Sequence, residues 1–175
     1  MMESERIILR KWEMKDTYVL VENLNDSKMA YDLGTEYPYT FEMACKYIRD
    51  AIKYNKEKYA IVYKKNMKVI GGCGLHIMDK MVSGNMWLSK KYQGIGIGTE
   101  TAIVLVDYCF KKLDMDRMYN IYFENNKASK NMQEKIGGKV CEGSTSIVVT
   151  GKVRVKKNVV ITKNNFEKAV SLLRG

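Results

Sequence analysis

The stretch Gln93-Gly94-Ile95-Gly96-Ile97-Gly98-Thr99 places glycine at three alternating positions between two segments of different periodicity. Residues 86–89 before it are predicted to form a strand, and apolar residues after it recur at helical spacing to about Leu113. Glycines at the start of a helix leave backbone N–H groups uncovered, and the helix dipole adds to their attraction for an anion. The stretch therefore predicts a strand, a turn and a helix that bind a phosphate group, with a diphosphate as the natural ligand.

Two common phosphate-binding patterns fit this stretch poorly. A P-loop ends in Gly-Lys-Ser or Gly-Lys-Thr, whereas Gly98-Thr99-Glu100 lacks the lysine. A Rossmann fingerprint needs glycine at position 99 and normally follows the first strand of a parallel sheet. Asp114 and Asp116 do lie about 20 residues on, where that fold places a ribose-binding acid. A tight turn whose glycines serve only packing is a further interpretation, which stays open at this point.

On either side of the turn, the chain alternates between strand-like and helix-like periodicity. Seven strands are predicted, at residues 7–12, 59–63, 69–78, 86–89, 118–123, 140–149 and 153–162. Helices are predicted at residues 16–25, 40–52 and 126–137, from the glycine turn to about residue 113, and at 165–173. We expect a turn at residues 83–85 and an irregular, tyrosine-rich loop at residues 26–39.

This order of elements predicts one domain over residues 1–175, of the α/β (α+β) class. Short connections between the central strands imply antiparallel neighbours. We therefore expect a mixed, largely antiparallel twisted sheet of about seven strands with helices on both faces.

Composition excludes several classes of protein. With 46% apolar and 29% charged residues, the chain of 175 residues is expected to be globular rather than disordered. No apolar run approaches the roughly 20 residues that span a bilayer, and residues 1–6 do not begin a secretion signal, so we expect a cytoplasmic protein with no membrane partner. The net charge of +10 favours phosphate-bearing partners.

The cysteines and the histidine narrow the chemistry further. Four cysteines without a C-x-x-C pair, together with a single histidine, His76, exclude a Cys/His zinc site and argue against a disulfide framework. His76 would have to be the base of any Ser-His-Asp or Cys-His hydrolase, and its apolar surroundings in the sequence instead predict a histidine packed in the core.

Taken together, the motifs resemble the GNAT superfamily of N-acetyltransferases. Gln93 to Gly98 fit in full that family's coenzyme A pattern, Q/R-x-x-G-x-G/A. Residues 126–129 and 133–138 are similar to its N-x-x-S/A…lEKlGF helix. The last two predicted strands and residues 162–167 resemble the tail of the RimJ/RimL-like and polyamine-type branch. The resemblance extends from Ile7 to Phe166.

By this resemblance, the chain has a GNAT-like acyl-CoA N-acyltransferase fold and acetyl-CoA is the cosubstrate, without a metal. The acetyl group would pass to a primary amine, which attacks the thioester directly in a ternary complex. The amine would belong to a protein N-terminus, a polyamine or a small molecule. The strands before and after the turn and helix would splay apart around the thioester. The residues implied in coenzyme binding are Leu88, through its amide, Gln93, Gly94, Ile95, Gly96, Ile97, Gly98, Thr99 and Asn126.

The resemblance also suggests the groups that move protons. Ser129 is the candidate acid for the departing thiolate, because Gln133 stands where polyamine-type members carry a tyrosine. The glutamate that many relatives carry before the turn is absent. Glu124 is our candidate base, with Glu36, His76 and a chain of waters as the alternatives. Asn126 has a second interpretation as a helix N-cap.

The acceptor pocket is expected beneath the first two helices, with Tyr31, Glu36 and Tyr37 as its candidate residues. Acids beside aromatics suit a cationic amine, although the tyrosines could equally pack the loop down. Arg154 and Lys156 alternate with valines, which is typical of a solvated basic edge strand. Relatives often form homodimers, and docking to RNA or a ribosome is a weaker alternative. A different class of function is a non-catalytic acyl-CoA-binding or nucleic-acid-binding module on the same fold. It is motivated by Gln133 and by the absence of the relatives' glutamates, both before the turn and on the penultimate strand.

Overall fold

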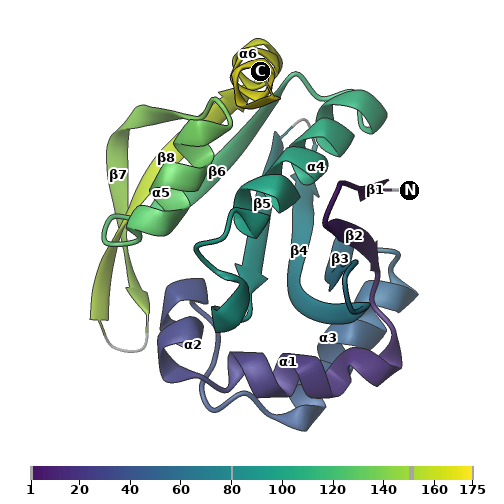
Figure 1. Cartoon of the computed structure of the whole chain (residues 1–175). Coiled ribbons are helices and arrows are strands. Elements are labelled where there is room, and N and C mark those ends of the chain that lie inside the picture. Colours follow the sequence, from purple (N-terminus) through teal and green to yellow (C-terminus); the bar gives the residue numbers. More distant parts are fainter. Residues whose placement is uncertain (1, 80, 150–151, 175) are drawn as a thin grey trace.

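The computed structural model describes residues 2–79, 81–149 and 152–174 (Figure 1). Its strands are β1 (Met2–Glu3), β2 (Ile7–Lys11), β3 (Lys58–Tyr63), β4 (Lys68–Met78), β5 (Met81–Leu88), β6 (Arg117–Phe123), β7 (Lys139–Val149) and β8 (Lys152–Thr162). Its helices are α1 (Thr17–Leu24), α2 (Ser27–Leu33), α3 (Phe41–Lys53), α4 (Ile97–Lys112), α5 (Lys127–Lys135) and α6 (Lys163–Arg174). Short 3₁₀ turns lie at Met14–Asp16 and Lys90–Tyr92.

The strands form two antiparallel sheets that lie side by side. β1 to β5 pair in chain order, and the second sheet has the order β6-β8-β7. No ladder joins β5 to β6 among the described residues. The two edges touch where the Gly84 N–H donates to Oδ1 of Asn120 at 2.8 Å. The predicted fold class is confirmed, with one strand, β1, beyond those expected.

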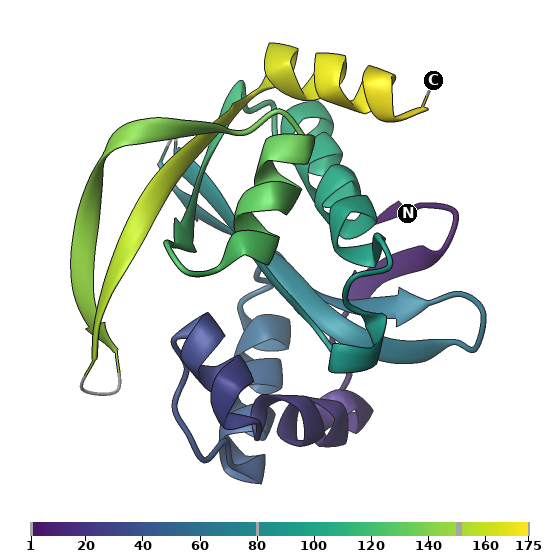
Figure 2. The same ribbon diagram turned by 60° about the vertical axis from the view of Figure 1, so that its left-hand side comes forward.

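Helices cover both faces of the larger sheet, as Figures 1 and 2 show. Alternate residues of β3 supply the two faces, as a strand requires. Tyr59 and Ile61 pack in the core with α4, whereas Ala60 packs in a second core with α1 and α3. Phe166 of α6 joins the first core, with its ring 5.6 Å from that of Phe110. The helix that follows the glycine turn is thus seated on the sheet along its length.

The turn expected at residues 83–85 is wrong, because these residues lie inside β5. β4 and β5 pair without interruption until Met78 meets Met81. A Cβ on Gly84 would lie 2.4 Å from Cε of Met118 in β6, so this glycine permits a close approach of the two sheets. His76 was expected in the core and is exposed, since β4 extends beyond the core from this residue onward.

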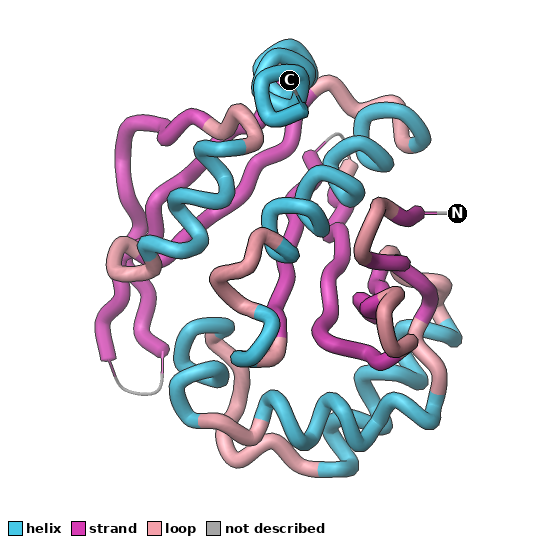
Figure 3. The backbone as a smooth tube through the Cα atoms, in the orientation of Figure 1, coloured by secondary structure: helices cyan, strands magenta, loops and turns pink. Residues whose placement is uncertain are grey.

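The loop expected at residues 26–39 contains the short helix α2, visible in the tube of Figure 3. Asp26 caps its start, with Oδ1 accepting the Met29 N–H at 2.8 Å. Gly34, at a φ of 69°, ends it in the left-handed conformation. The helix places Tyr31 and Asp32 on a fixed element rather than a loop.

Candidate active site

The glycine turn leads from β5 into the N-terminus of α4. Gly94 and Gly96 have φ angles of 75° and 85°, which L side chains rarely adopt. Gly96 is the N-cap of α4, and no side chain hydrogen-bonds to this helix end within the part of the chain that the structure describes. A Cβ on Gly94 would meet no atom within 4 Å. The predicted strand, turn and helix are confirmed, and the geometry leaves first-turn N–H groups for an anion.

Arg6, in the connection between β1 and β2, anchors this turn. Its Nη1 donates to the backbone oxygen of Ile95 at 2.9 Å, and its Nε lies 2.6 Å from Oε2 of Glu100 in the first turn of α4. The Arg6 N–H and the Ser4 hydroxyl both donate to Oε1 of Glu100, at 2.8 and 2.6 Å. Partial burial opposes ionisation of Glu100, yet these hydrogen bonds and the Arg6 charge lower its pKa overall. Sequence reasoning missed this anchor, because Arg6 lies far from the turn in the chain.

The N–H of Leu88 points from β5 toward β6. Ser89 donates its N–H to the Ile70 oxygen at 2.8 Å, so the neighbouring pair of Leu88 and Gly71 is not hydrogen-bonded across β4 and β5. Gly84 lies four residues before Leu88 in β5, so its N–H points to the same side, and this N–H donates to Asn120 of β6. The Leu88 N–H therefore faces the gap between the two sheets.

The other predicted loop residues differ in burial and in their contacts. Gln93 Nε2 donates to the Leu88 oxygen at 2.8 Å, which ties the turn to the end of β5. Ile97 is fully buried in the core, whereas Ile95 is about half exposed. Gly98 and Thr99 lie in the first turn of α4, and a Cβ on Gly98 would make only an ordinary contact, at 3.6 Å, with Leu88.

A second pair of candidates lies at the start of α5. Asn126 is the N-cap of this helix, with Oδ1 accepting the Ser129 N–H at 3.0 Å. Gln133, one turn on and 3% exposed, donates from Nε2 to the Ile121 oxygen at 3.2 Å and to Ser129 Oγ at 3.1 Å. A carbonyl oxygen only accepts, so Ile121 fixes the orientation of this amide. Ser129 Oγ is therefore an acceptor from Gln133, and its own proton is directed elsewhere.

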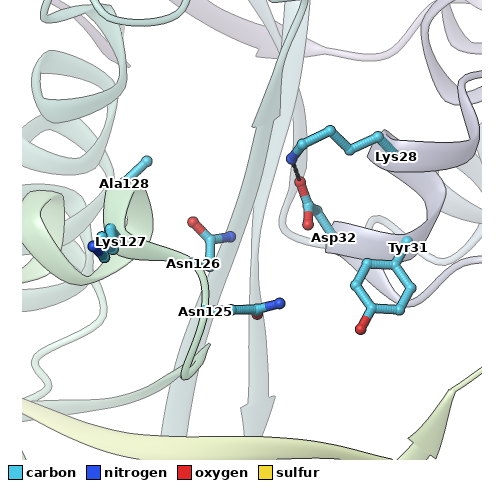
Figure 4. Close-up of a pocket in the computed structure, with 7 residues that line it drawn as sticks. All are labelled: Lys28, Tyr31, Asp32, Asn125, Asn126, Lys127 and Ala128. Atoms are coloured by element: carbon cyan, nitrogen blue, oxygen red, sulfur yellow. Dashed lines mark hydrogen bonds and ion pairs between the residues drawn. The ribbon is translucent and has the colours of Figure 1, made fainter. Parts of the chain in front are cut away.

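A cavity of about 500 Å³ lies between α2 and the start of α5 (Figure 4). Its lining consists of Lys28, Tyr31 and Asp32 from α2 and Asn125, Asn126, Lys127 and Ala128 from the opposite wall. Lys28 and Asp32 form an ion pair with a separation of 2.6 Å. The cavity thus brings the predicted acceptor residue Tyr31 to the same space as the predicted coenzyme residue Asn126.

Arg154 is buried, contrary to the solvated edge expected from its sequence pattern. Its Nη1 donates to the backbone oxygen of Tyr31, and its Cζ lies 3.9 Å from the centroid of the Tyr31 ring and 3.3 Å from that of Phe123. The basic residue was misread because its partner Tyr31 lies on a distant helix. Lys156, two residues on, is partly buried.

The remaining candidates are not among the residues that line the cavity. Glu124 follows β6 directly, is largely exposed and pairs with Lys157 at 3.2 Å. Glu36 and Tyr37 lie in the exposed connection between α2 and α3, and Tyr37 is 54% exposed. All four cysteines are free, and no cluster of metal-ligating side chains occurs within the described residues.

Comparisons with known proteins assign the chain to one family of proteins. The model of the acetyltransferase (GNAT) domain matches residues 6–139. An uncharacterized N-acetyltransferase, p20 of Bacillus licheniformis, is 26% identical over 123 residues, which cover 66% of this chain and 68% of p20.

Two solved structures have the same fold. One is spermidine N-acetyltransferase from Vibrio cholerae in complex with CoA and spermine, with a TM-score of 0.80, 17% identity and coverage of 92% of this chain and 98% of that chain. The other is RimL, the ribosomal L7/L12 alpha-N-protein acetyltransferase, in complex with coenzyme A, with a TM-score of 0.78, 16% identity and coverage of 91% and 95%. The protein belongs to the GNAT acetyltransferase family, and its fold is that of the RimL-like and polyamine-type members. None of the helices in the described ranges is long and apolar enough to cross a membrane.

Proposed function

We propose that the protein is an acetyl-CoA-dependent N-acetyltransferase that acts on a primary amine by direct attack in a ternary complex. The observation that carries the proposal is the N-terminus of α4, where Gly94 and Gly96 hold a left-handed backbone and no described side chain caps the helix. Membership of an acetyltransferase family supports the same reaction class. Holding thioester and amine in one cleft removes much of the entropic barrier between them.

In this proposal, the main chain binds the cosubstrate. The N–H groups of residues 94–99 hold the pyrophosphate, and Arg6 keeps their turn in shape through Ile95 and Glu100. The pantetheine arm lies in the gap between β5 and β6, where it contacts Asn126. The Leu88 N–H, which points into this gap, stabilises the oxyanion that forms when the amine attacks the acetyl carbonyl.

Ser129 supplies the proton that the departing thiolate takes up, and solvent water returns a proton to Oγ. Because Gln133 donates to Ser129 Oγ, the hydroxyl proton is left to point at another acceptor, and the same hydrogen bond stabilises the oxygen as the proton leaves. Gln133 is thus a positioning residue for Ser129.

Glu124 is the proposed acceptor of the proton that the amine loses. Its carboxylate lies 3.2 Å from Nζ of Lys157 and is largely exposed. Glu124 directly precedes Asn125 of the cavity wall, and its exposure lets the proton pass on to solvent through water. Tyr31 is the proposed acceptor-binding residue of the cavity, with Glu36 and Tyr37 at its approach.

The test is thiol release from acetyl-CoA with a panel of peptides, polyamines and small primary amines. We expect at least one class to support turnover and to yield the N-acetyl product by mass spectrometry. Coenzyme binding without turnover on any amine would contradict the enzyme and favour a non-catalytic acyl-CoA-binding module.

A further inference from the structure

The guanidinium of Arg154 is a buried charge that the proposed reaction does not use. Arg154 is 4% exposed, and within the described ranges its Nη1 alone is paired, with the Tyr31 backbone oxygen. Nε and Nη2 are both buried and have no hydrogen-bond partner among the described residues. Buried donors of a charged group are normally paired, because water can no longer satisfy them. Two orphaned donors on one side chain therefore indicate a missing acceptor.

The two unpaired atoms form one edge of the guanidinium plane. This edge matches a carboxylate or phosphate, which accepts from Nε and Nη2 through two parallel hydrogen bonds. The rings of Tyr31 and Phe123 lie against the guanidinium, 3.9 and 3.3 Å from Cζ, and fix its position. The side chain is consequently a preorganised fork for an oxyanion.

The strand register places this fork beside the cavity. Phe123 pairs with Lys156, the Glu124 N–H donates to the Val155 oxygen, and the Phe123 ring lies against the guanidinium, so Arg154 contacts the end of β6, two residues before Asn125. Asn125 lines one wall of the cavity, and Tyr31, which contacts the guanidinium, lines the other. Arg154 thus adjoins both walls.

Neighbouring carboxylates of the chain are already paired. Asp32 binds Lys28 at 2.6 Å, and Glu124 binds Lys157 at 3.2 Å. The cavity lining itself carries Lys28 and Lys127 against Asp32 alone, so its charge is positive. These charges suit an anionic ligand better than the cationic amine expected from the acids in the sequence.

We propose that Arg154 binds a carboxylate or phosphate carried by the acceptor amine. This inference rests on the proposed function, because it names the class of acceptor. The fork is shielded from solvent in the structure, and Tyr31 touches both the guanidinium and the cavity. An oxyanion accepts from Nε and Nη2 in the plane of the guanidinium through two charge-assisted hydrogen bonds, so the Tyr31 and Phe123 rings can stay against its faces.

The test compares four amines of similar length: γ-aminobutyrate, its amide, aminopropyl phosphate and putrescine. We expect kcat/KM to be higher for an anionic amine than for the amide. Whichever of γ-aminobutyrate and aminopropyl phosphate has the higher kcat/KM shows whether Arg154 binds a carboxylate or a phosphate. In Arg154→Met, kcat/KM for that anionic amine should fall by about 30-fold or more, with little change for the amide. Lys156→Met, which removes another positive charge from the same face of β8, is the matched control and should retain the preference. If the acceptor proves to be a peptide, the matched pair is glutamate against glutamine beside its N-terminus.

Several results would overturn the inference. One is a preference of the unaltered enzyme for the amide or putrescine. Another is an equal loss for all amines in Arg154→Met, which would indicate that Arg154 only clamps α2. If Arg154→Met does not fold, Arg154→Lys, which keeps the charge and loses the fork, must still lower the anionic preference. Coenzyme binding without any turnover would instead contradict the proposed function. The binding of an oxyanion by Arg154 would then be tested separately, by calorimetric titration of γ-aminobutyrate into the unaltered chain and into Arg154→Met. Equal binding to the two proteins, or no binding to either, would count against the inference.

Discussion

Ser129 is expected to govern release of the thiolate without contributing to coenzyme affinity. We predict that Ser129→Ala lowers kcat by about 100-fold, and that Gln133→Leu, which removes the donor to Ser129 Oγ, gives a smaller loss and shifts the kcat–pH profile. Steady-state kinetics over a pH series would measure both effects, with coenzyme affinity from calorimetry. Ser144→Ala, on an exposed position of β7, is the control. Full activity in Ser129→Ala would mean that solvent protonates the thiolate.

Glu100 should link the stability of the fold to pH. Its pKa is lowered in the folded chain because hydrogen bonds from Ser4 and Arg6 outweigh partial desolvation. A depressed folded pKa stabilises the protein fully above the unfolded value near 4.5 and progressively less as pH falls through the folded value. We predict that Glu100→Gln lowers the free energy of unfolding by about 1–2 kcal/mol at neutral pH, and that this difference shrinks in acid.

Urea titrations of Glu100→Gln at several pH values would check this dependence. Glu134→Gln is the control, since Glu134 is exposed and its partner Lys130 is 3.7 Å away. A difference between Glu100→Gln and the unaltered chain that stays constant from neutral to acid pH would contradict the assigned cause.

At the scale of elements, the N-terminus of α5 has two roles that substitution can separate. Asn126→Ala removes the cap on the Ser129 N–H and should cost about 1 kcal/mol of stability. Asn126→Asp keeps an oxygen acceptor at the cap and should be nearly as stable as the unaltered chain. Its negative charge and missing amide N–H should nevertheless weaken coenzyme binding. Thermal unfolding and calorimetry together test this, and an unchanged coenzyme affinity in Asn126→Asp would leave Asn126 as a cap alone.

Some elements were predictable because their causes are local. The glycine turn carries its own signal, since residues at positive φ that open a helix are most easily glycine. The helix α2 was missed, although Asp26 and Gly34 are ordinary start and stop signals. Gly84 was misread as a turn because its cause, the approach of Met118, lies in another sheet. Turns and helix caps that depend on neighbouring residues can be predicted from the sequence, whereas contacts between distant segments cannot.

The same limit applies to the site when the whole molecule is considered. The sequence indicated the turn, Asn126 and Ser129, which lie in two short segments that the fold places at adjacent edges of two sheets. It gave no sign of the Arg6 anchor or of the contact between Arg154 and Tyr31, whose partners are 94 and 123 residues apart in the chain. The gap between the sheets, and hence the direction of the Leu88 N–H, follows only from the assembled topology.

The most direct measurement of the central claim is a calorimetric titration of coenzyme A into the unaltered chain, Gly96→Val and Gly98→Ala. A side chain at position 96 must adopt the left-handed backbone at a cost of about 1–2 kcal/mol, so Gly96→Val should weaken binding by about tenfold or more. Gly98→Ala has ordinary backbone angles and an ordinary contact at 3.6 Å, so it should bind almost as the unaltered chain does. Unchanged affinity in a folded Gly96→Val protein would contradict the assignment of this turn to the pyrophosphate.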